Sequence, residues 1–187
     1  QSGILMNHNK LNQFFIYQLN TRIFCIENGT KLPQTPESFF SSPDVLAADA
    51  VWLMGVWFPS TASVKICKSH EGLNHEFQKS LPDLVDTDII GSPYAVYEYK
   101  PNPIIAEHNL QLKQFRYKLN TIGKKLILDF VPNHMSVDSP LIDLYPDLFL
   151  YKKEPGAVVC KNSFLHKNGR IYYHGRDPYF DGWTDTV

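Results

Sequence analysis

The residues best suited to chemistry in this sequence are an acid, an amide and an imidazole that close one apolar run. The run LILDFVPNH, residues 126–134, contains Asp129, Asn133 and His134. Side chains alternate along a strand, so Asp129 and Asn133 would share one face. Pro132 lacks the N–H that ladder pairing needs, which predicts that the strand stops near it. Asn133 and His134 are therefore expected at the carboxyl end of a strand.

A carboxylate, an amide and an imidazole can hold a polar ligand by accepting and donating hydrogen bonds. In parallel α/β proteins the carboxyl ends of the strands form the rim where ligands bind, in open sheets and closed barrels alike. A structural role is the alternative, because a strand aspartate can cap a loop and an Asn-His pair after proline can form a turn. The spacing of these residues alone leaves both interpretations open.

Three apolar segments are expected to form the sheet that positions this rim. The segment 14–26 is rich in aromatic and β-branched residues and is followed by Asn28-Gly29, a turn signal. The segment 50–57 is apolar without polar alternation, as in a parallel strand covered on both faces. Together with 126–131, these segments predict three parallel strands that lie side by side in chain order.

The connections between these strands differ in how clearly they predict helices. The segment 36–49 permits a helix but is short and is interrupted by Pro43. Apolar residues recur at every fourth position over 70–81 and along one face of 105–122, which predicts two helices. Gly123 is placed to end the second one. One glycine and three prolines make 91–103 a loop.

The order strand, connection, strand, helix, strand predicts an α/β fold with a parallel sheet and right-handed crossovers. After His134 the sequence loses any clear period, and prolines recur through 135–187. We expect this segment to be a long, loop-rich excursion, a type of insertion that is usually functional.

The composition excludes several classes of protein. The formal net charge is −1 and no strongly basic stretch occurs, which argues against nucleic acid as a partner. No apolar run is long enough to span a membrane, and the first ten residues lack the order of a secretory signal, so a cytoplasmic protein is expected. The three cysteines are odd in number and widely spaced, which favours reduced thiols.

Four stretches of the sequence resemble, in the right order, the α-amylase family of glycoside hydrolases, family 13. They are AVWLMGVW in its second strand, GSPYAVYEYKPNP in the following loop, DFVPNH at the end of its third strand, and GRDPYFDGWTDTV, which is common in bacterial members. The resemblance implies a partial (β/α)8 TIM barrel made of the first three β/α units. Residues 1–187 would be the N-terminal part of the catalytic domain, with 135–187 as the excursion after the third strand.

The resemblance also implies roles for single residues. Tyr94 would stack on a sugar ring next to the cleaved bond, because an aromatic face covers the apolar C–H side of a glucose unit. His134 would hydrogen-bond a hydroxyl of the same sugar. Asp129 would orient an arginine near the nucleophile, and Asn133 would steady the loop or, as in many members, help to bind calcium. The implied substrate is an α-glucan or an α-glucoside.

The family's catalytic residues are not matched in this chain. A retaining glycosidase needs two carboxyl groups about 5–5.5 Å apart, and the family places them on its fourth and fifth strands, beyond Val187. Asp177, Asp181 and Asp185 match positions that have no catalytic role. We therefore expect an N-terminal fragment of a retaining glycoside hydrolase or transglycosidase, inactive alone, whose partner would be the remainder of the barrel.

Two other interpretations remain open. The chain could be a non-catalytic glucan-binding or interaction module that keeps Tyr94 and His134 without the catalytic carboxylates. It could also be an unrelated small α/β domain in which DFVPNH occurs by chance.

Overall fold

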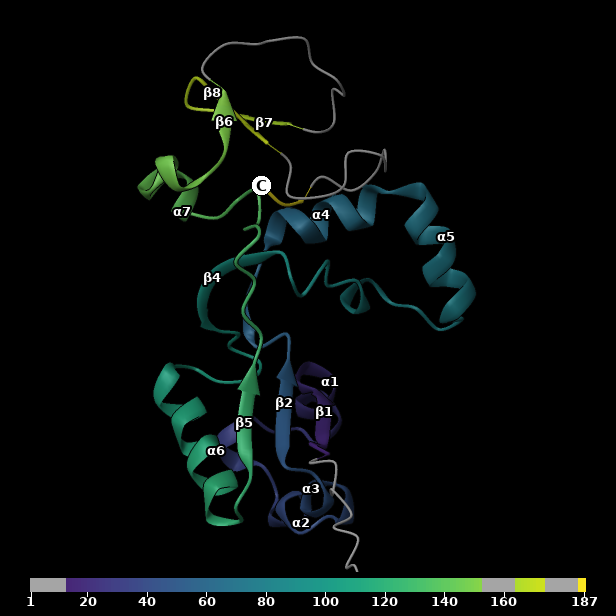
Figure 1. The fold of residues 1–187 in the computed structure, drawn as a ribbon. Helices are drawn as coiled ribbons and strands as arrows, with labels where there is room; N and C mark the ends of the chain where they lie inside the picture. The colour runs from purple at the N-terminus through teal and green to yellow at the C-terminus, as the bar shows by residue number, and fades with distance from the viewer. Residues whose placement is uncertain (1–12, 153–163, 174–184) are drawn as a thin grey trace, which may run out of the picture.

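The structure is a computed structural model, and it describes residues 13–152, 164–173 and 185–187. Its central sheet is parallel and has the strand order β1-β2-β5 (Figure 1). These strands are β1 (Ile16–Asn20), β2 (Ala50–Met54) and β5 (Lys125–Leu128). Tyr17 pairs with Val51, which pairs with Leu126 on its other side. The prediction of three parallel strands adjacent in chain order is confirmed.

Each strand is shorter than the sequence predicted. The first stops at Asn20 because the Asn20 side chain accepts a hydrogen bond from the N–H of Ile23 and so begins helix α1 (Thr21–Glu27). The second is interrupted at Gly55, whose φ of 65° turns the backbone out of the extended conformation. The third ends at Leu128, one residue before Asp129, rather than at residue 131.

The two predicted helices are confirmed as α5 (Glu71–Ser80) and α6 (Asn109–Thr121). Helix α6 ends at Thr121, and Gly123 follows its C-cap residue with φ of 74°, as predicted. The helix begins at Asn109, four residues later than the predicted start at Ile105. A further helix that the sequence analysis missed precedes α5. The remaining short helices are α2 (Glu37–Phe40), α3 (Pro43–Ala47), the missed α4 (Thr61–Ser69), and the 3-10 turns η1 (Leu32–Gln34) and η2 (Asp86–Asp88).

The prediction of a loop over 91–103 is wrong for its second half. Residues Val96–Pro101 form strand β4, which pairs antiparallel with β3 (Trp57–Pro59) in an irregular register. Aromatic pairs join the two strands: the Trp57 and Tyr99 rings lie 5.3 Å apart, and the Phe58 and Tyr97 rings 5.6 Å apart. Cross-strand aromatic pairs of this kind stabilise a short ribbon despite the prolines at its ends.

The segment after His134 contains more regular structure than predicted. An antiparallel sheet of order β6-β8-β7 follows a short helix, and a turn at Asn168-Gly169, with both residues at positive φ, joins its last two strands. The elements are α7 (Leu141–Leu144), η3 (Pro146–Leu148), β6 (Tyr151–Lys152), β7 (Phe164–Lys167) and β8 (Arg170–Tyr173). Asp177, Asp181 and most of the stretch 175–187 lie outside the described residues.

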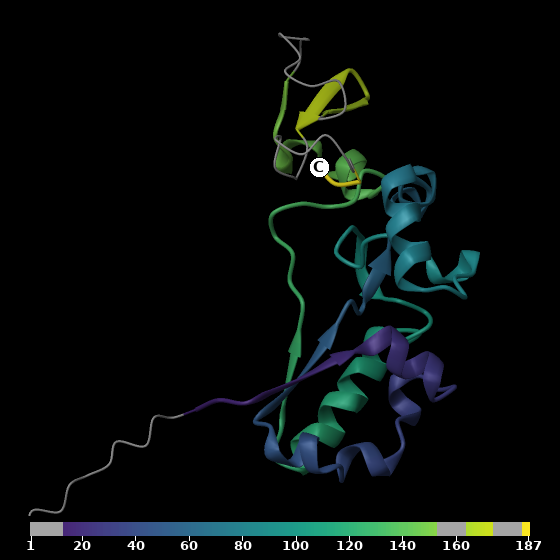
Figure 2. The ribbon, with the colours of Figure 1, turned by 90° about the vertical axis from the view of Figure 1, so that its right-hand side faces the viewer.

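The carboxyl ends of β2 and β5 point toward one side of the molecule, where β3, β4 and α4 gather (Figure 2). The chain leaving β5 crosses this side and pairs with the last residues of the sequence. Met135 and Val187 exchange two backbone hydrogen bonds of 2.9 Å, and the N–H of Val137 donates to the carbonyl oxygen of Asp185. This side is the rim predicted from the strand order.

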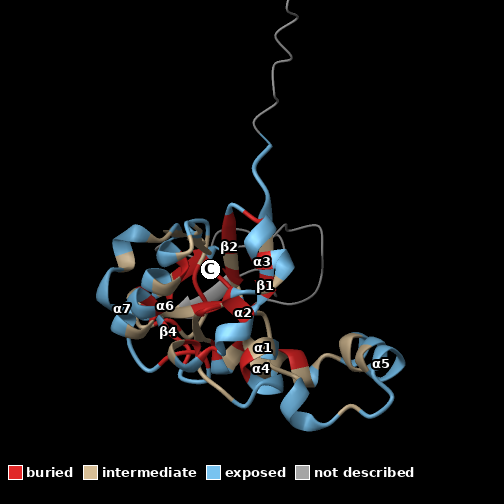
Figure 3. Cartoon of the chain, turned by 90° about the horizontal axis from the view of Figure 1, so that it is seen from below, coloured by how far each residue is buried: buried red, intermediate tan, exposed pale blue. Residues whose placement is uncertain are grey.

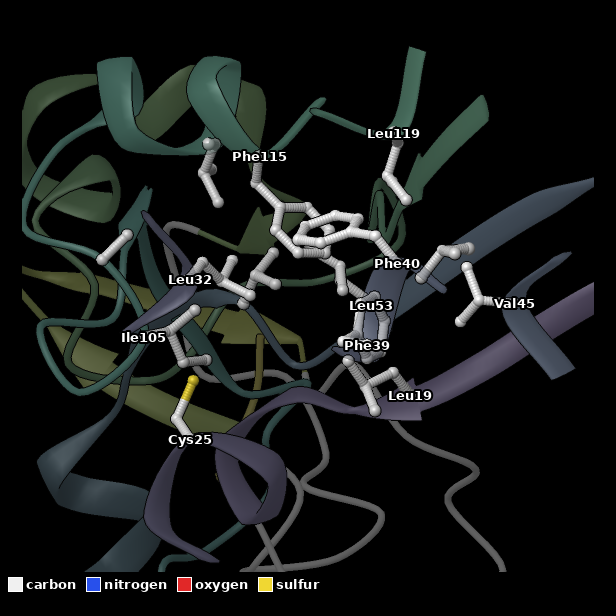
Figure 4. Packing of buried hydrophobic residues seen from close by; sticks show 14 residues of the cluster. Leu19, Cys25, Leu32, Phe39, Phe40, Val45, Leu53, Ile105, Phe115 and Leu119 are labelled. Atoms are coloured by element: carbon white, nitrogen blue, oxygen red, sulfur yellow. The ribbon is translucent and has the colours of Figure 1, made fainter. Parts of the chain in front are cut away.

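One face of the central sheet is covered by helices and carries the main core (Figures 3 and 4). Phe115 of α6 is fully buried, and its ring lies 5.6 Å from that of Phe40 and 6.0 Å from that of Phe39. Leu19 and Leu53 reach this core from the sheet. The opposite face of the sheet is open, since Ile16 is 48% exposed. Among the described residues, no helix has the length and apolar character needed to cross a membrane.

Candidate functional site

Asp129 lies directly after β5 and is held by donors from the end of β2 and from β3. Its Oδ1 accepts a hydrogen bond of 2.7 Å from the indole Nε1 of Trp52, and its Oδ2 accepts one of 2.6 Å from the N–H of Gly55. The backbone carbonyl of Asp129 accepts a further bond of 2.7 Å from Trp57 Nε1. These bonds replace ladder pairing after Leu128. Asp129 therefore ties the carboxyl ends of two neighbouring strands together.

Tyr94 and His134 meet at the same rim, although they lie on different loops. The Nε2 atom of His134 lies 3.2 Å from the carbonyl oxygen of Tyr94, and Nε2 must be the donor because a carbonyl only accepts. Burial raises the pKa of Tyr94, and the charge of Asp129 adds to that shift, so the Tyr94 hydroxyl keeps its proton. The expected convergence of Tyr94, Asp129 and His134 at one rim is confirmed.

The second ring nitrogen of His134 faces Asn133. Nδ1 lies 3.3 Å from the side-chain Nδ2 of Asn133, which can donate to it when the proton is on Nε2. The distance is longer than in most hydrogen bonds of this kind. A ligand hydroxyl could therefore replace the Asn133 amide at Nδ1 without breaking the contact to Tyr94. Asn133 itself is exposed.

The calcium role implied for Asn133 can be compared with the acidic side chains of the described residues. Calcium takes six to eight oxygen ligands, with carboxylates among them. Within residues 13–152, 164–173 and 185–187, no group of three or more His, Cys, Asp or Glu side chains lies close enough together to hold a metal ion. Calcium binding by Asn133 therefore stays a prediction.

A cavity of about 690 Å³ opens beside Tyr94 and His134. Its volume lies in the range of small-molecule sites, which is roughly 300–1,000 Å³. His134 also borders a second cavity of about 590 Å³, which Asn133 and Phe130 help to line. The imidazole thus stands between two spaces large enough for a ligand.

Asp185 reaches the first cavity from the end of the chain. It is 4% exposed, and its Oδ2 accepts a hydrogen bond of 2.7 Å from the hydroxyl of Ser63 on α4. The Ser63 oxygen in turn accepts a bond of 2.9 Å from the N–H of Ser92. Asp185 therefore holds α4 and the loop before β4 together.

Asp138 is a structural residue of the site that the sequence analysis missed. Its carboxylate accepts hydrogen bonds from the hydroxyl of Ser60 at 2.6 Å, the hydroxyl of Thr61 at 3.1 Å and the N–H of Ala62 at 2.9 Å. It thereby caps the first turn of α4 from a loop far along the chain. Ser60-Thr61 was a readable start signal for α4, but nothing local identified Asp138 as its partner.

We expect Asp138→Asn to make the free energy of unfolding vary less with pH in the acid range. Burial alone would raise the pKa of Asp138, but the bonds from Ser60 and Ala62 outweigh it and lower that pKa. A lowered pKa stabilises the fold above about pH 4, the ordinary value of an aspartate, and this contribution is lost as the pH falls through the folded value. Urea titrations should show a loss of about 1–2 kcal/mol at neutral pH, shrinking toward acid pH.

The exposed Asp83 provides the matched control for this experiment. Asp83→Asn should leave the free energy of unfolding within about 0.5 kcal/mol of the wild type. A loss for Asp138→Asn that is the same at acid and neutral pH would contradict the charge-dependent role.

No protein-family model and no curated protein matches the sequence. Solved structures do match the fold. An alpha-amylase from Lactobacillus plantarum matches with a TM-score of 0.52 and 22% identity over 78% of this chain. The trehalose-6-phosphate hydrolase of Bacillus licheniformis matches with a TM-score of 0.57 and 17% identity over 92% of this chain. The fold resembles the N-terminal part of family 13 barrels.

This chain spans 29% of the length of each of those two structures. A maltogenic alpha-amylase from Thermotoga neapolitana is matched similarly, with a TM-score of 0.50 and 17% identity over 89% of this chain and 33% of that one. At these identities the likeness establishes an α/β fold with a parallel sheet. It agrees with the fold that the sequence motifs implied.

Proposed function

We propose that this chain forms the N-terminal part of a family 13 catalytic barrel, as its first three β/α units, and provides part of a binding site for α-glucans or α-glucosides. The observation that carries the proposal is the meeting of Tyr94 and His134 over one cavity at the carboxyl rim of a parallel sheet. That position is where parallel α/β proteins bind their ligands. The enzyme would be a retaining hydrolase or transglycosidase.

In this proposal Tyr94 provides the face on which a glucose ring stacks. An aromatic ring covers the C–H side of a sugar and favours positive charge that develops beside it. Burial and the nearby Asp129 keep the phenol protonated, so it can also donate a hydrogen bond. The Tyr94 carbonyl oxygen accepts the His134 hydrogen bond, which holds the backbone that carries the ring.

His134 would bind a hydroxyl of the same sugar through Nδ1. Its Nε2 is occupied by the Tyr94 carbonyl, which leaves Nδ1 as an acceptor. Asn133 holds Nδ1 at 3.3 Å and would be displaced by the sugar hydroxyl. Asn133 would thus support the loop in the absence of a sugar.

Asp129 would support the site from below. Its carboxylate already accepts bonds from Trp52 and Gly55, and each oxygen keeps a further lone pair for the arginine that the family pattern implies. The nucleophile and the acid/base carboxylates would come from strands four and five of the barrel. No residue of this chain is assigned a catalytic role.

The proposal is tested by measuring the affinity of the 187-residue chain for methyl α-glucoside in an NMR chemical-shift titration. Tyr94→Ala and His134→Ala should each weaken binding about tenfold, which corresponds to about 1.4 kcal/mol. Tyr117 offers a control of the same residue type, since it lies on α6 and is 70% exposed. Tyr117→Ala should leave the affinity unchanged. An affinity that Tyr94→Ala also leaves unchanged would overturn the proposal.

A further inference from the structure

Helix α5 directs its apolar face toward a cavity instead of the core. Leu73, Phe77 and Leu81 recur at every fourth position at this helix, yet α5 has no buried residue. Figure 3 shows it at the periphery, without any buried segment. All three side chains line the cavity of about 690 Å³ that also contains Tyr94 and His134.

The chain that follows α5 continues the same apolar wall. Leu84, Ile89 and Ile90 line the cavity before the chain reaches Tyr94. The same cavity is therefore lined by Tyr94 and His134 and by these aliphatic side chains. The two kinds of lining suit different chemical groups.

The wall is fixed to the rest of the molecule at Gly91. This glycine has φ of 70°, and a Cβ atom there would lie 2.8 Å from the backbone of Ser63 and of Val64. The close approach seats the loop on α4. Three polar residues there are paired with one another, because the Ser63 hydroxyl donates to Asp185 and accepts from the N–H of Ser92.

We propose that the cavity selects an α-glucoside whose sugar carries an apolar aryl or alkyl group. This inference rests on the proposed sugar site at Tyr94 and His134 and names the class of its substrate. The hydroxyl groups of a second glucose unit would need hydrogen-bond partners, and the side chains of Leu73, Phe77 and Ile90 offer none. An apolar group would instead move from water to the apolar lining of the cavity, which is favourable.

The size of the expected gain follows from the area buried. Each methylene group that leaves water tightens binding by about fourfold. A hexyl group that buries only half its length should therefore bind at least about 30-fold more tightly than a methyl group on the same sugar.

The experiment compares hexyl α-glucoside with methyl α-glucoside by titration calorimetry on the 187-residue chain. The wild type should prefer hexyl α-glucoside by at least about 30-fold. Phe77→Ser should reduce this ratio at least about tenfold. Because α5 has no buried residue, this substitution does not alter the hydrophobic core. Tyr117→Ser on α6 is the control and should leave the ratio unchanged.

The outcomes separate this inference from the proposed function. Equal affinities for the two glucosides, both weakened by Tyr94→Ala, would overturn the apolar pocket and keep the sugar site. A hexyl preference that Phe77→Ser removes, in a protein whose affinity for both glucosides is unchanged by Tyr94→Ala, would overturn the sugar site, and with it the assignment of a glucoside. If neither hexyl nor methyl α-glucoside binds, both the apolar pocket and the sugar site are overturned.

Discussion

The 187-residue chain, purified by itself, is expected to release no detectable nitrophenol from p-nitrophenyl α-glucoside at any pH. Enzymes lower reaction barriers by about 8–23 kcal/mol, whereas the roles proposed for Tyr94 and His134 are only stacking and hydrogen bonds to hydroxyl groups. Such contacts bind substrate and transition state to similar degrees, and uniform binding does not raise kcat. The two carboxylates that a retaining mechanism needs are implied on strands that are not among these residues.

The aryl glucoside makes this a demanding assay, because nitrophenol leaves with little help from an acid. The control is His134→Ala, purified in the same way. Turnover above that control would show that a carboxylate of this chain acts as a nucleophile. Asp185→Asn would then show whether the buried Asp185 beside the cavity is responsible.

Replacing Asp129 by asparagine is expected to destabilise the fold by about 3 kcal/mol. The carboxylate accepts bonds from two donors, the Trp52 indole and the Gly55 N–H, and a bond to a charged group is worth about 1.5–3 kcal/mol. An amide keeps one acceptor and points an NH2 group at the other donor. Urea unfolding followed by tryptophan fluorescence should show the loss directly, because Trp52 reports on the site.

The same variant should also weaken methyl α-glucoside binding, since Asp129 fixes the strand ends beneath Tyr94 and His134. Asp83→Asn again provides the exposed control. A loss of stability below about 1 kcal/mol would mean that the Trp52 and Gly55 donors find other partners, and Asp129 would then have no structural role at the rim.

The parallel sheet could be predicted from sequence because its signals are local. Three apolar runs, one helix ending at Gly123 and the proline after Asp129 each act within a few residues. The strand ends were less predictable. Asn20 stops β1 through a side-chain cap, and Gly55 stops β2 through a positive φ, within runs that look uniformly apolar.

The site was predictable only where a motif marked it. DFVPNH and the loop before β4 identified Asp129, His134 and Tyr94, and the structure brings these three residues together. Asp138 could not be found in the same way, because its partners Ser60 and Ala62 at the start of α4 lie 78 and 76 residues away in the sequence. The period of α5 predicted a helix correctly but could not show that its apolar face meets a cavity.

The place of α4 and α5 in the chain has a consequence for how freely the cavity wall can change. Pairing of Ala50 with Lys125 closes a single loop that contains both helices. The entropy lost in closing a loop grows only with the logarithm of its length, so even a doubling adds about 0.6 kcal/mol. Insertions or deletions around α5 would therefore leave the β2–β5 pairing almost unaffected. The lining of this cavity and the stability of the sheet can thus change independently of each other.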